Sequence, residues 1–255
     1  MIKLISGYKP EIHKGRDVRA GNIRAYGLEC ENLLGTLWGD PLFIESVKKI
    51  IGNNMVTALK LANIYLIMSN WLPQLGPGDI IEFGSYRGGC AVFMALVARE
   101  LKLPIHIYGL DTFNGMPKTN KKIDHHKSGD FSNTSLEGVQ KLAASFDLKN
   151  ITFVPGLFQE TAEKTLSNCK PILIAHIDCD IESGVRYSYD TVKDHMIDTG
   201  GYIVFDDPLH GSCLGAFQVI EDCLIRRDKL SAEQAYPHLV YRYPKLKNDN
   251  VKTNN

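Results

Sequence analysis

Four aspartates that end two short apolar runs are the residues best placed to do chemistry in this sequence. Asp178 and Asp180 directly follow the run Ile172–Ile177, and Asp206 and Asp207 end the next run along the chain. Carboxylates held within a few ångströms repel one another unless one is protonated or a cation neutralises them. Oxygen ligands suit magnesium, which keeps several waters that substrate oxygens can replace. We therefore predict a magnesium ion bound by Asp178, Asp206 and Asp207.

A metal ion at this place would bind a substrate hydroxyl, lower its pKa and hold it in line for reaction. A nearby base must then take the proton, and Asp180 is the preferred candidate. His210 is the alternative catalytic base, because it lies close to Asp207 in the sequence. The competing interpretation is structural: the acids would cap the following helices or pair with Arg186 and Lys193.

A glycine-containing turn upstream could bind a cofactor. Glu82 lies near the end of an apolar run and is followed by Gly84, Gly88 and Gly89, so backbone amides can face a ligand without obstruction by a Cβ atom. The spacing is Gly-x-x-x-Gly-Gly, and not the Gly-x-Gly-x-x-Gly that lets a backbone approach a pyrophosphate. A carboxylate at Glu82 would repel a pyrophosphate, but it suits a cofactor that carries an ammonium and a sulfonium. The turn therefore favours S-adenosylmethionine over a dinucleotide.

A second acid strengthens this interpretation. Asp111 closes the next apolar run, where a carboxylate can accept hydrogen bonds from both ribose hydroxyls. The structural alternatives are a cap or an ion pair for Glu82 and a turn-forming role for Asp111. Gly156 and Phe158 follow the third run and either wall the adenine or form an ordinary turn. The predicted cofactor-binding residues are Glu82, Gly84, Ser85, Gly88, Asp111, Thr112, Gly156, Phe158 and Asp178.

The elements that must position these residues follow from hydrophobic patterning. Short apolar runs alternate with amphipathic segments, as expected when parallel strands are covered by helices on both faces. The predicted strands are Asp79–Phe83, Ile105–Leu110, Ile151–Pro155, Ile172–Ile177 and Gly201–Phe205, with an edge strand at Leu239–Tyr243. The predicted helices are Met55–Trp71, Cys90–Leu101, Leu136–Phe146, one carrying Val185 to Met196 on a single face, and Leu214–Ile225. Right-handed crossovers make a doubly wound, mostly parallel α/β sheet the economical topology, with ligands at the strand C-termini.

Three parts are predicted along the chain: an N-terminal helical cap over residues 1–78, the cofactor-binding domain over 79–244 and a disordered tail over 245–255. The polar insertion Lys118–Asp130 leaves the strand-end face and is interpreted as a mobile substrate lid. Its lysines either meet the phosphates of a nucleotide-linked sugar or are simply solvated; they are Lys118, Lys121, Lys122 and Lys127. His125 and His126 within it, and His176, are interpreted as structural or solvated.

The composition limits the classes of partner that the protein is expected to bind. The chain has 255 residues, 23% of them charged, and a formal net charge of +0, which provides no global field to hold nucleic acid or an acidic membrane surface. No apolar stretch approaches the length of a membrane span, and the first residues do not resemble a secretory leader. We therefore expect a cytoplasmic protein without nucleic-acid or membrane partners. The six cysteines show no metal-binding or redox spacing and are interpreted as reduced thiols.

Four motifs together resemble the macrocin O-methyltransferase (TylF-type) family over roughly Met55–Ile225. They are IIEFGSYRGG, LDTFNGMP, HIDCD and FDD. The resemblance implies a Rossmann-like class I methyltransferase fold, S-adenosylmethionine, magnesium, and methylation of a sugar hydroxyl on a natural product or related glycoconjugate by a homo-oligomer. Carried onto this chain, it places cofactor contacts at Glu82, Gly84 and Asp111, metal ligands at Asp178, Asp206 and Asp207, and the base at Asp180.

The chain departs from the family pattern beside the base. Where the family tends to have Asp-Gly-Asp-Leu-Tyr-Glu-Ser, this sequence has Asp178-Cys-Asp-Ile-Glu-Ser183, which leaves the shape of that loop open. The alternative acceptor is a phenolic or catechol hydroxyl, for which the same metal chemistry applies. A metal-dependent hydrolase would leave Glu82 and Asp111 without a role, and a non-catalytic cofactor-binding protein would not need acids at every motif.

Overall fold

One seven-stranded sheet forms the centre of the molecule, in the order β3-β2-β1-β4-β5-β7-β6. The computed structural model describes Leu37 and residues 39–244. The strands are β1 (Asp79–Phe83), β2 (Ile107–Asp111), β3 (Ile151–Pro155), β4 (Ile172–Ile177), β5 (Gly201–Phe205), β6 (Ala232–Gln234) and β7 (Leu239–Tyr243). The first five pair in parallel, whereas β7 is antiparallel to β5 and β6 is antiparallel to β7. The carboxyl ends of the five parallel strands therefore share one edge.

The predicted doubly wound, mostly parallel sheet is confirmed. Strands β1, β4 and β5 are buried at every position, which explains why most of their residues are apolar on both faces of the strand. Strand β2 begins at Ile107, two residues later than predicted, because Ile105 is still part of a turn and its N–H bonds to the carbonyl oxygen of Leu103.

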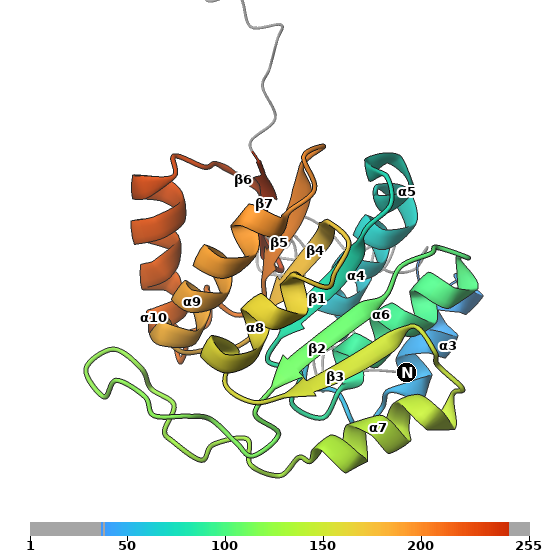
Figure 1. Cartoon of the computed structure of the whole chain (residues 1–255), viewed down its shortest axis with the longest axis horizontal. Coiled ribbons are helices and arrows are strands. Elements are labelled where there is room, and N and C mark those ends of the chain that lie inside the picture. The colour runs from blue at the N-terminus through green and yellow to red at the C-terminus, as the bar shows by residue number, and fades with distance from the viewer. Residues whose placement is uncertain (1–36, 38, 245–255) are drawn as a thin grey trace, which may run out of the picture.

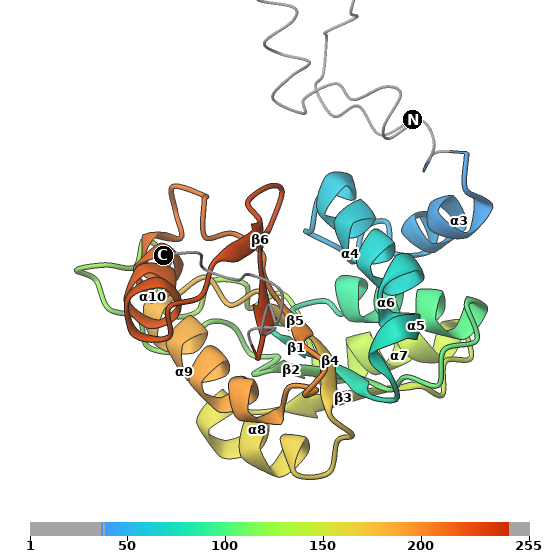
Figure 2. The ribbon, with the colours of Figure 1, turned by 90° about the horizontal axis from the view of Figure 1, so that it is seen from above.

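Helices cover both faces of this sheet (Figures 1 and 2). One layer consists of α3 (Pro41–Lys49), α4 (Ala58–Asn70), α5 (Leu72–Leu75), α6 (Gly89–Glu100) and α7 (Leu136–Ser145). The other consists of α8 (Phe158–Leu166), α9 (Glu182–Val192) and α10 (Leu214–Val219), with the 3₁₀ turn η1 (Lys193–His195) and the π-helix η2 (Ile220–Arg227) continuing α9 and α10. Each layer has its own buried apolar cluster against the sheet.

Helix α4 brings the N-terminal segment to the sheet edge. It starts at Ala58, where the Thr57 hydroxyl accepts a hydrogen bond from the backbone N–H of Lys60 at 3.4 Å, a typical N-cap. Its apolar residues pack in the same cluster as α6. The sequence predicted that this helix begins at Met55, but Met55 lies two residues before the N-cap, Thr57. The predicted tail and residues 1–36 and 38 lie outside the described residues.

Over the part of the chain that the structure describes, the helices are too short or too polar for a membrane span. Five of the six cysteines fall within it, and all five are free thiols.

Candidate active site

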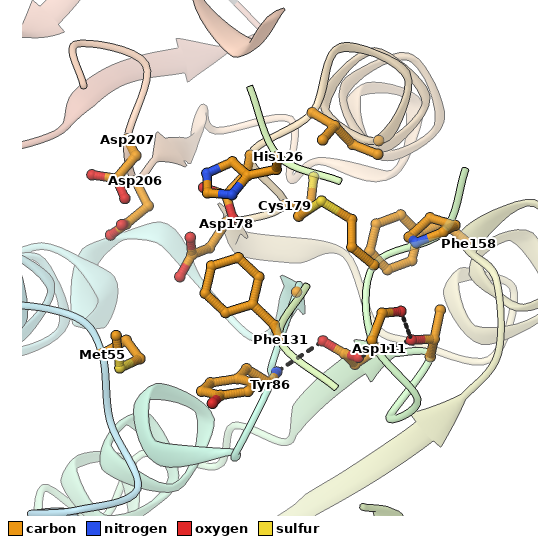
Figure 3. A pocket seen from close by; sticks show the side chains of 18 of the residues that line it. Met55, Tyr86, Asp111, His126, Phe131, Phe158, Asp178, Cys179, Asp206 and Asp207 are labelled. Atoms are coloured by element: carbon orange, nitrogen blue, oxygen red, sulfur yellow. Dashed lines mark hydrogen bonds between the residues drawn. The ribbon is translucent and has the colours of Figure 1, made fainter. Parts of the chain in front are cut away.

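A cavity of about 420 Å³ lies at the carboxyl edge of the parallel strands. The predicted site residues that line it are Gly84, Asp111, Thr112, Phe158, Asp178, Asp180, Asp206, Asp207 and His210. Figure 3 shows Asp111 on one side of this cavity and the aspartates of β4 and β5 on the other, with Phe131 between them. Four predicted residues do not line it: Glu82, Ser85, Gly88 and Gly156.

Two glycines shape the turn after β1. Gly84 has a φ of 95°, and a Cβ atom on it would lie only 1.8 Å from the carbonyl oxygen of Asp178. Glycine is therefore required where the ends of β1 and β4 meet. Gly88 has a φ of 75° at the N-cap of α6, and a Cβ there would press on Phe153 and Val139. Its role is to close the turn, which explains why it does not reach the cavity.

Asp111 is oriented by backbone amides. Its Oδ2 accepts from the N–H of Tyr86 and its Oδ1 from the N–H of Phe113, both at 2.8 Å. Burial raises the pKa of Asp111, an effect that these two amide hydrogen bonds oppose. The carboxylate is thus fixed at the cavity wall beside Thr112, with oxygen lone pairs left to accept further hydrogen bonds.

Glu82 differs from its predicted position. Its side chain is 1% exposed, and its carboxylate accepts from the Ser85 hydroxyl at 2.6 Å and from His176 Nδ1 at 3.0 Å. Side chains alternate along a strand, so Glu82 shares the face of β1 that packs against α6, where Cys90 also approaches His176. Neither Glu82 nor Ser85 therefore lies where it could contact a ligand in the cavity.

Gly156 is also directed away from the cavity. A Cβ on it would meet Thr161 of α8 at 2.8 Å. The cavity wall after β3 is formed instead by the next three residues, Leu157, Phe158 and Gln159.

Three carboxylates converge at the ends of β4 and β5. One oxygen from each of Asp178, Asp180 and Asp207 lies within 4.8 Å of the other two. Burial, with the charges of Asp206 and Asp180, raises the pKa of Asp178 well above its ordinary value. An all-carboxylate set of this kind fits a hard divalent cation such as magnesium, which would supply the missing positive charge.

Asp206 lies beside these three carboxylates but has other partners. Its Oδ2 accepts from Lys60 Nζ at 2.6 Å and its Oδ1 accepts from His238 Nε2 at 3.0 Å, while His176 Nε2 lies 3.6 Å from Oδ1. Burial alone would raise the pKa of Asp206, but these partners outweigh it and hold that pKa well below the ordinary value. The predicted ligand set Asp178, Asp206 and Asp207 is thus divided, and Asp180 takes the third place in the cluster.

Lys60 is a site residue that the sequence interpretation missed. Its ammonium contacts both Asp206 and Asp207, and its side chain is 11% exposed. Burial would lower the pKa of Lys60, but the two carboxylates raise it, so the lysine stays charged. A lysine among the apolar residues of a predicted helix was the available signal. No signal in the sequence indicated His238, which directly precedes β7 and accepts a hydrogen bond from Asn63 Nδ2 at 2.9 Å.

The loop beside the predicted base has an unusual backbone. Asp180 has a φ of 58°, and the N–H of Ile181 bonds to the carbonyl oxygen of Cys179 at 2.6 Å, closing a three-residue turn. Cys213 Sγ donates to Asp180 Oδ1 at 3.2 Å. Burial raises the pKa of Asp180, which brings a carboxylate closer to the range useful for a general base.

Two histidines line the cavity, and only one of them was predicted to do so. His210 is exposed at the mouth of the cavity, where its Nδ1 lies 2.7 Å from the Ser212 hydroxyl. His126, interpreted from sequence as structural or solvated, also lines the cavity. The four lysines of the polar insertion are exposed and none of them lines the cavity.

Comparison with known proteins agrees with this geometry. The macrocin-O-methyltransferase (TylF) family matches residues 48–223. The chain is 22% identical over 187 residues, 69% of this chain and 70% of the relative, to 8-demethyl-8-(2,3-dimethoxy-alpha-L-rhamnosyl)-tetracenomycin-C 4'-O-methyltransferase of Streptomyces olivaceus.

Two solved structures share the fold. The O-methyltransferase NovP has a TM-score of 0.61 at 19% identity, covering 75% of this chain and 84% of that one. The SAH-bound Podospora anserina methyltransferase PaMTH1 has a TM-score of 0.57 at 13% identity, covering 93% and 100%. These similarities show that this chain has the class I methyltransferase fold. With the family match over most of its length, the chain belongs to the macrocin-O-methyltransferase (TylF) family and is an S-adenosylmethionine-dependent O-methyltransferase.

Proposed function

We propose that this enzyme transfers the methyl group of S-adenosylmethionine to a hydroxyl of a sugar, with a magnesium ion at the carboxylate cluster. One observation carries the proposal: the same cavity joins Asp111, held by two backbone amides, to the converging carboxylates of Asp178, Asp180 and Asp207. The name of the Streptomyces olivaceus relative, which includes a rhamnosyl group, supports a sugar acceptor.

The cofactor half of the cavity is formed by the ends of β1, β2 and β3. We assign the ribose hydroxyls to Asp111, because its carboxylate is oriented before any ligand arrives. Gly84 lines the cavity at the turn after β1, and Phe158 and Leu157 provide an apolar wall for the adenine. S-adenosylmethionine supplies an electrophilic methyl group on its sulfonium.

The acceptor half is formed by the ends of β4 and β5. A magnesium ion held by Asp178 and Asp207 would lower the pKa of the acceptor hydroxyl. Asp207 also contacts Lys60, so its orientation does not depend on the metal alone. Asp180, which has a carboxylate oxygen within 4.8 Å of one from each of Asp178 and Asp207, is the proposed acceptor of the hydroxyl proton, and His210 is the alternative at the cavity mouth.

The test separates cofactor, metal and transfer. Calorimetry should show binding of S-adenosylmethionine and no binding of NAD, and methyl transfer to glycoside acceptors should stop on chelation and return with magnesium. Manganese titration followed by electron paramagnetic resonance should give a tight site that Asp207→Asn weakens. Asp198→Asn, an exposed aspartate outside the cavity, serves as the control. Transfer that is unaffected by chelation would remove the metal from the proposal.

A second acceptor class has one observation in its favour. Tyr86 and Phe131 both line the cavity, with ring centroids 5.5 Å apart at an interplanar angle of 75°, and such a wall could also hold a phenolic or catechol ring. An assay in which a catechol and glycosides compete for methylation decides between the phenolic and the sugar acceptor. A catechol that is methylated faster than every glycoside tested would replace the sugar with a phenolic acceptor.

A homo-oligomer is part of the same proposal, and light scattering coupled to size-exclusion chromatography would measure it directly.

A further inference from the structure

The loop between β2 and α7, residues 112–135, runs along the carboxyl edge of the sheet towards α9 and α10 (Figure 1). Backbone hydrogen bonds close its base, since the N–H of Met116 bonds to the oxygen of Asp130 at 2.7 Å and the N–H of Gly129 to the oxygen of Met116 at 2.9 Å. Its far end is attached independently. The loop is thus closed at its base and held at its far end, although it contains no helix or strand.

Asp124 makes the second attachment. It is 8% exposed, and its Oδ1 accepts from the N–H of Glu182, the first residue of α9, at 2.9 Å. The N-cap residue of that helix, Ile181, has no side-chain hydrogen bond to offer. The loop therefore supplies the missing cap, and its negative charge lies at the positive end of the helix.

Helix α10 has a glycine, Gly215, at the point where it faces this contact. A Cβ atom on Gly215 would lie 2.4 Å from Asp124 Oδ1 and 2.7 Å from the backbone nitrogen of Glu182. The neighbouring elements thus accommodate Asp124 in one position. Because the backbone is continuous, this contact also restricts where the adjacent loop residues can lie.

His126 comes two residues after Asp124 and its side chain, 18% exposed, lines the cavity. One of its ring nitrogens, a carboxylate oxygen of Asp180 and Cys213 Sγ all lie within 4.8 Å of one another. The imidazole has a partner on each side, since its Nδ1 is 3.6 Å from Asp130 Oδ2 and its ring centroid is 5.4 Å from that of Phe131. Figure 3 shows this ring at the same side of the cavity as Asp178 and Cys179.

We propose that His126 is a catalytic residue that hydrogen-bonds the acceptor hydroxyl beside Asp180, and that the contact of Asp124 with α9 holds it there. This inference rests on the proposed function. In the reaction the acceptor oxygen bonds to the methyl carbon while the carbon–sulfur bond breaks and leaves its electron pair on sulfur. The hydroxyl proton passes to Asp180, and the imidazole fixes the direction of the oxygen lone pair that attacks.

His125 provides a matched control, because it lies next to His126 in the same loop but is exposed and does not line the cavity. His126→Ala should lower kcat/KM for the acceptor by about 100-fold, whereas His125→Ala should stay within about 2-fold of the wild type. His126→Gln, which keeps a hydrogen-bonding group, should recover part of the loss. The affinity for S-adenosylhomocysteine, measured by calorimetry, should be the same in all three variants.

Gly215→Ala tests the attachment without touching the cavity. Alanine is the better helix former, but its methyl group would lie 2.4 Å from Asp124 Oδ1 and 2.7 Å from the backbone nitrogen of Glu182, so it must push Asp124 and the first residue of α9 apart. We expect a fall in kcat/KM of at least 10-fold and faster hydrogen exchange at the Glu182 amide. Gly138→Ala in α7, where the nearest atom is the hydroxyl of Ser135 at 3.1 Å, is the control and should change neither.

The outcomes are distinguishable. If the wild type methylates a sugar and His126→Ala is as active as His125→Ala, the role of His126 is refuted while the proposed function stands. If the wild type binds S-adenosylhomocysteine but methylates no hydroxyl acceptor, the proposed function fails and the inference fails with it. If Gly215→Ala leaves both the rate and the exchange unchanged, the role of Asp124 is refuted.

Discussion

Replacing Lys60 with methionine should destabilise the fold far more than an ordinary lysine substitution. The side chains of Lys60 and Asp206 are 11% and 4% exposed, and removal of one member of such a buried pair costs roughly 3 to 5 kcal/mol. Because His238 continues to hydrogen-bond Asp206, we expect the lower end, about 3 kcal/mol. Lys48 and Glu45 form a matched exposed pair at 60% and 58%, and Lys48→Met should cost about 1 kcal/mol or less.

Urea unfolding followed by circular dichroism gives these differences in the free energy of unfolding. Repeating it with magnesium chloride adds a second readout, since a ligand at 100 times its Kd stabilises the folded state by about 2.7 kcal/mol. Lys60→Met should gain more from magnesium than the wild type does, because the metal replaces a charge that the variant lacks. Unfolding of Lys60→Met at the same urea concentration as Lys48→Met would refute the reasoning.

Two single carboxylates give further predictions. Asp111→Asn should raise the Kd for S-adenosylhomocysteine by about 10-fold, the cost of roughly one charge-assisted hydrogen bond. It should also lower the free energy of unfolding by about 1 to 3 kcal/mol, because the new amide NH2 would face a backbone N–H donor. Calorimetry measures the Kd, and an unchanged Kd would remove Asp111 from the cofactor site. Hydrogen bonds from Arg227 and Tyr189, opposed by partial burial, lower the pKa of Asp228 to about 2. A depressed pKa contributes stability that is present above the unfolded value near 4 and is lost as the pH falls towards 2, about 1 to 2 kcal/mol after solvent screening. Asp228→Asn should therefore flatten the pH dependence of urea unfolding between pH 4 and 2, and an identical slope in the variant would contradict this.

The central strands could be predicted from the sequence because burial on both faces makes most of their residues apolar. Helix α8 was not predicted, since only Ala162, Thr165 and Leu166 of its nine residues are buried and the segment begins as an apparent turn. The start of β2 was displaced for a similar reason, because Ile105 is apolar and buried but turns before it pairs.

The site was predictable to the extent that it lies at strand ends. Asp111, Asp178 and Asp207 follow directly from the rule that parallel strands present their carboxyl ends at one edge. Lys60 and His126 could not be found this way, since they come from a helix and a loop whose distance from that edge is set by tertiary packing. Glu82 does not line the cavity, and a strand-end position in the sequence does not reveal which face of the sheet its side chain occupies.

His238 has a consequence for how the protein acquires its activity. The family match ends at residue 223, yet His238, a partner of Asp206, lies directly before β7, the last strand of the sheet in chain order. During synthesis from the N-terminus, Asp206 lacks its hydrogen bond with His238 until β7 has formed and paired with β5. A fragment ending at residue 223 would keep every recognisable motif and still lack the group that completes this buried pairing.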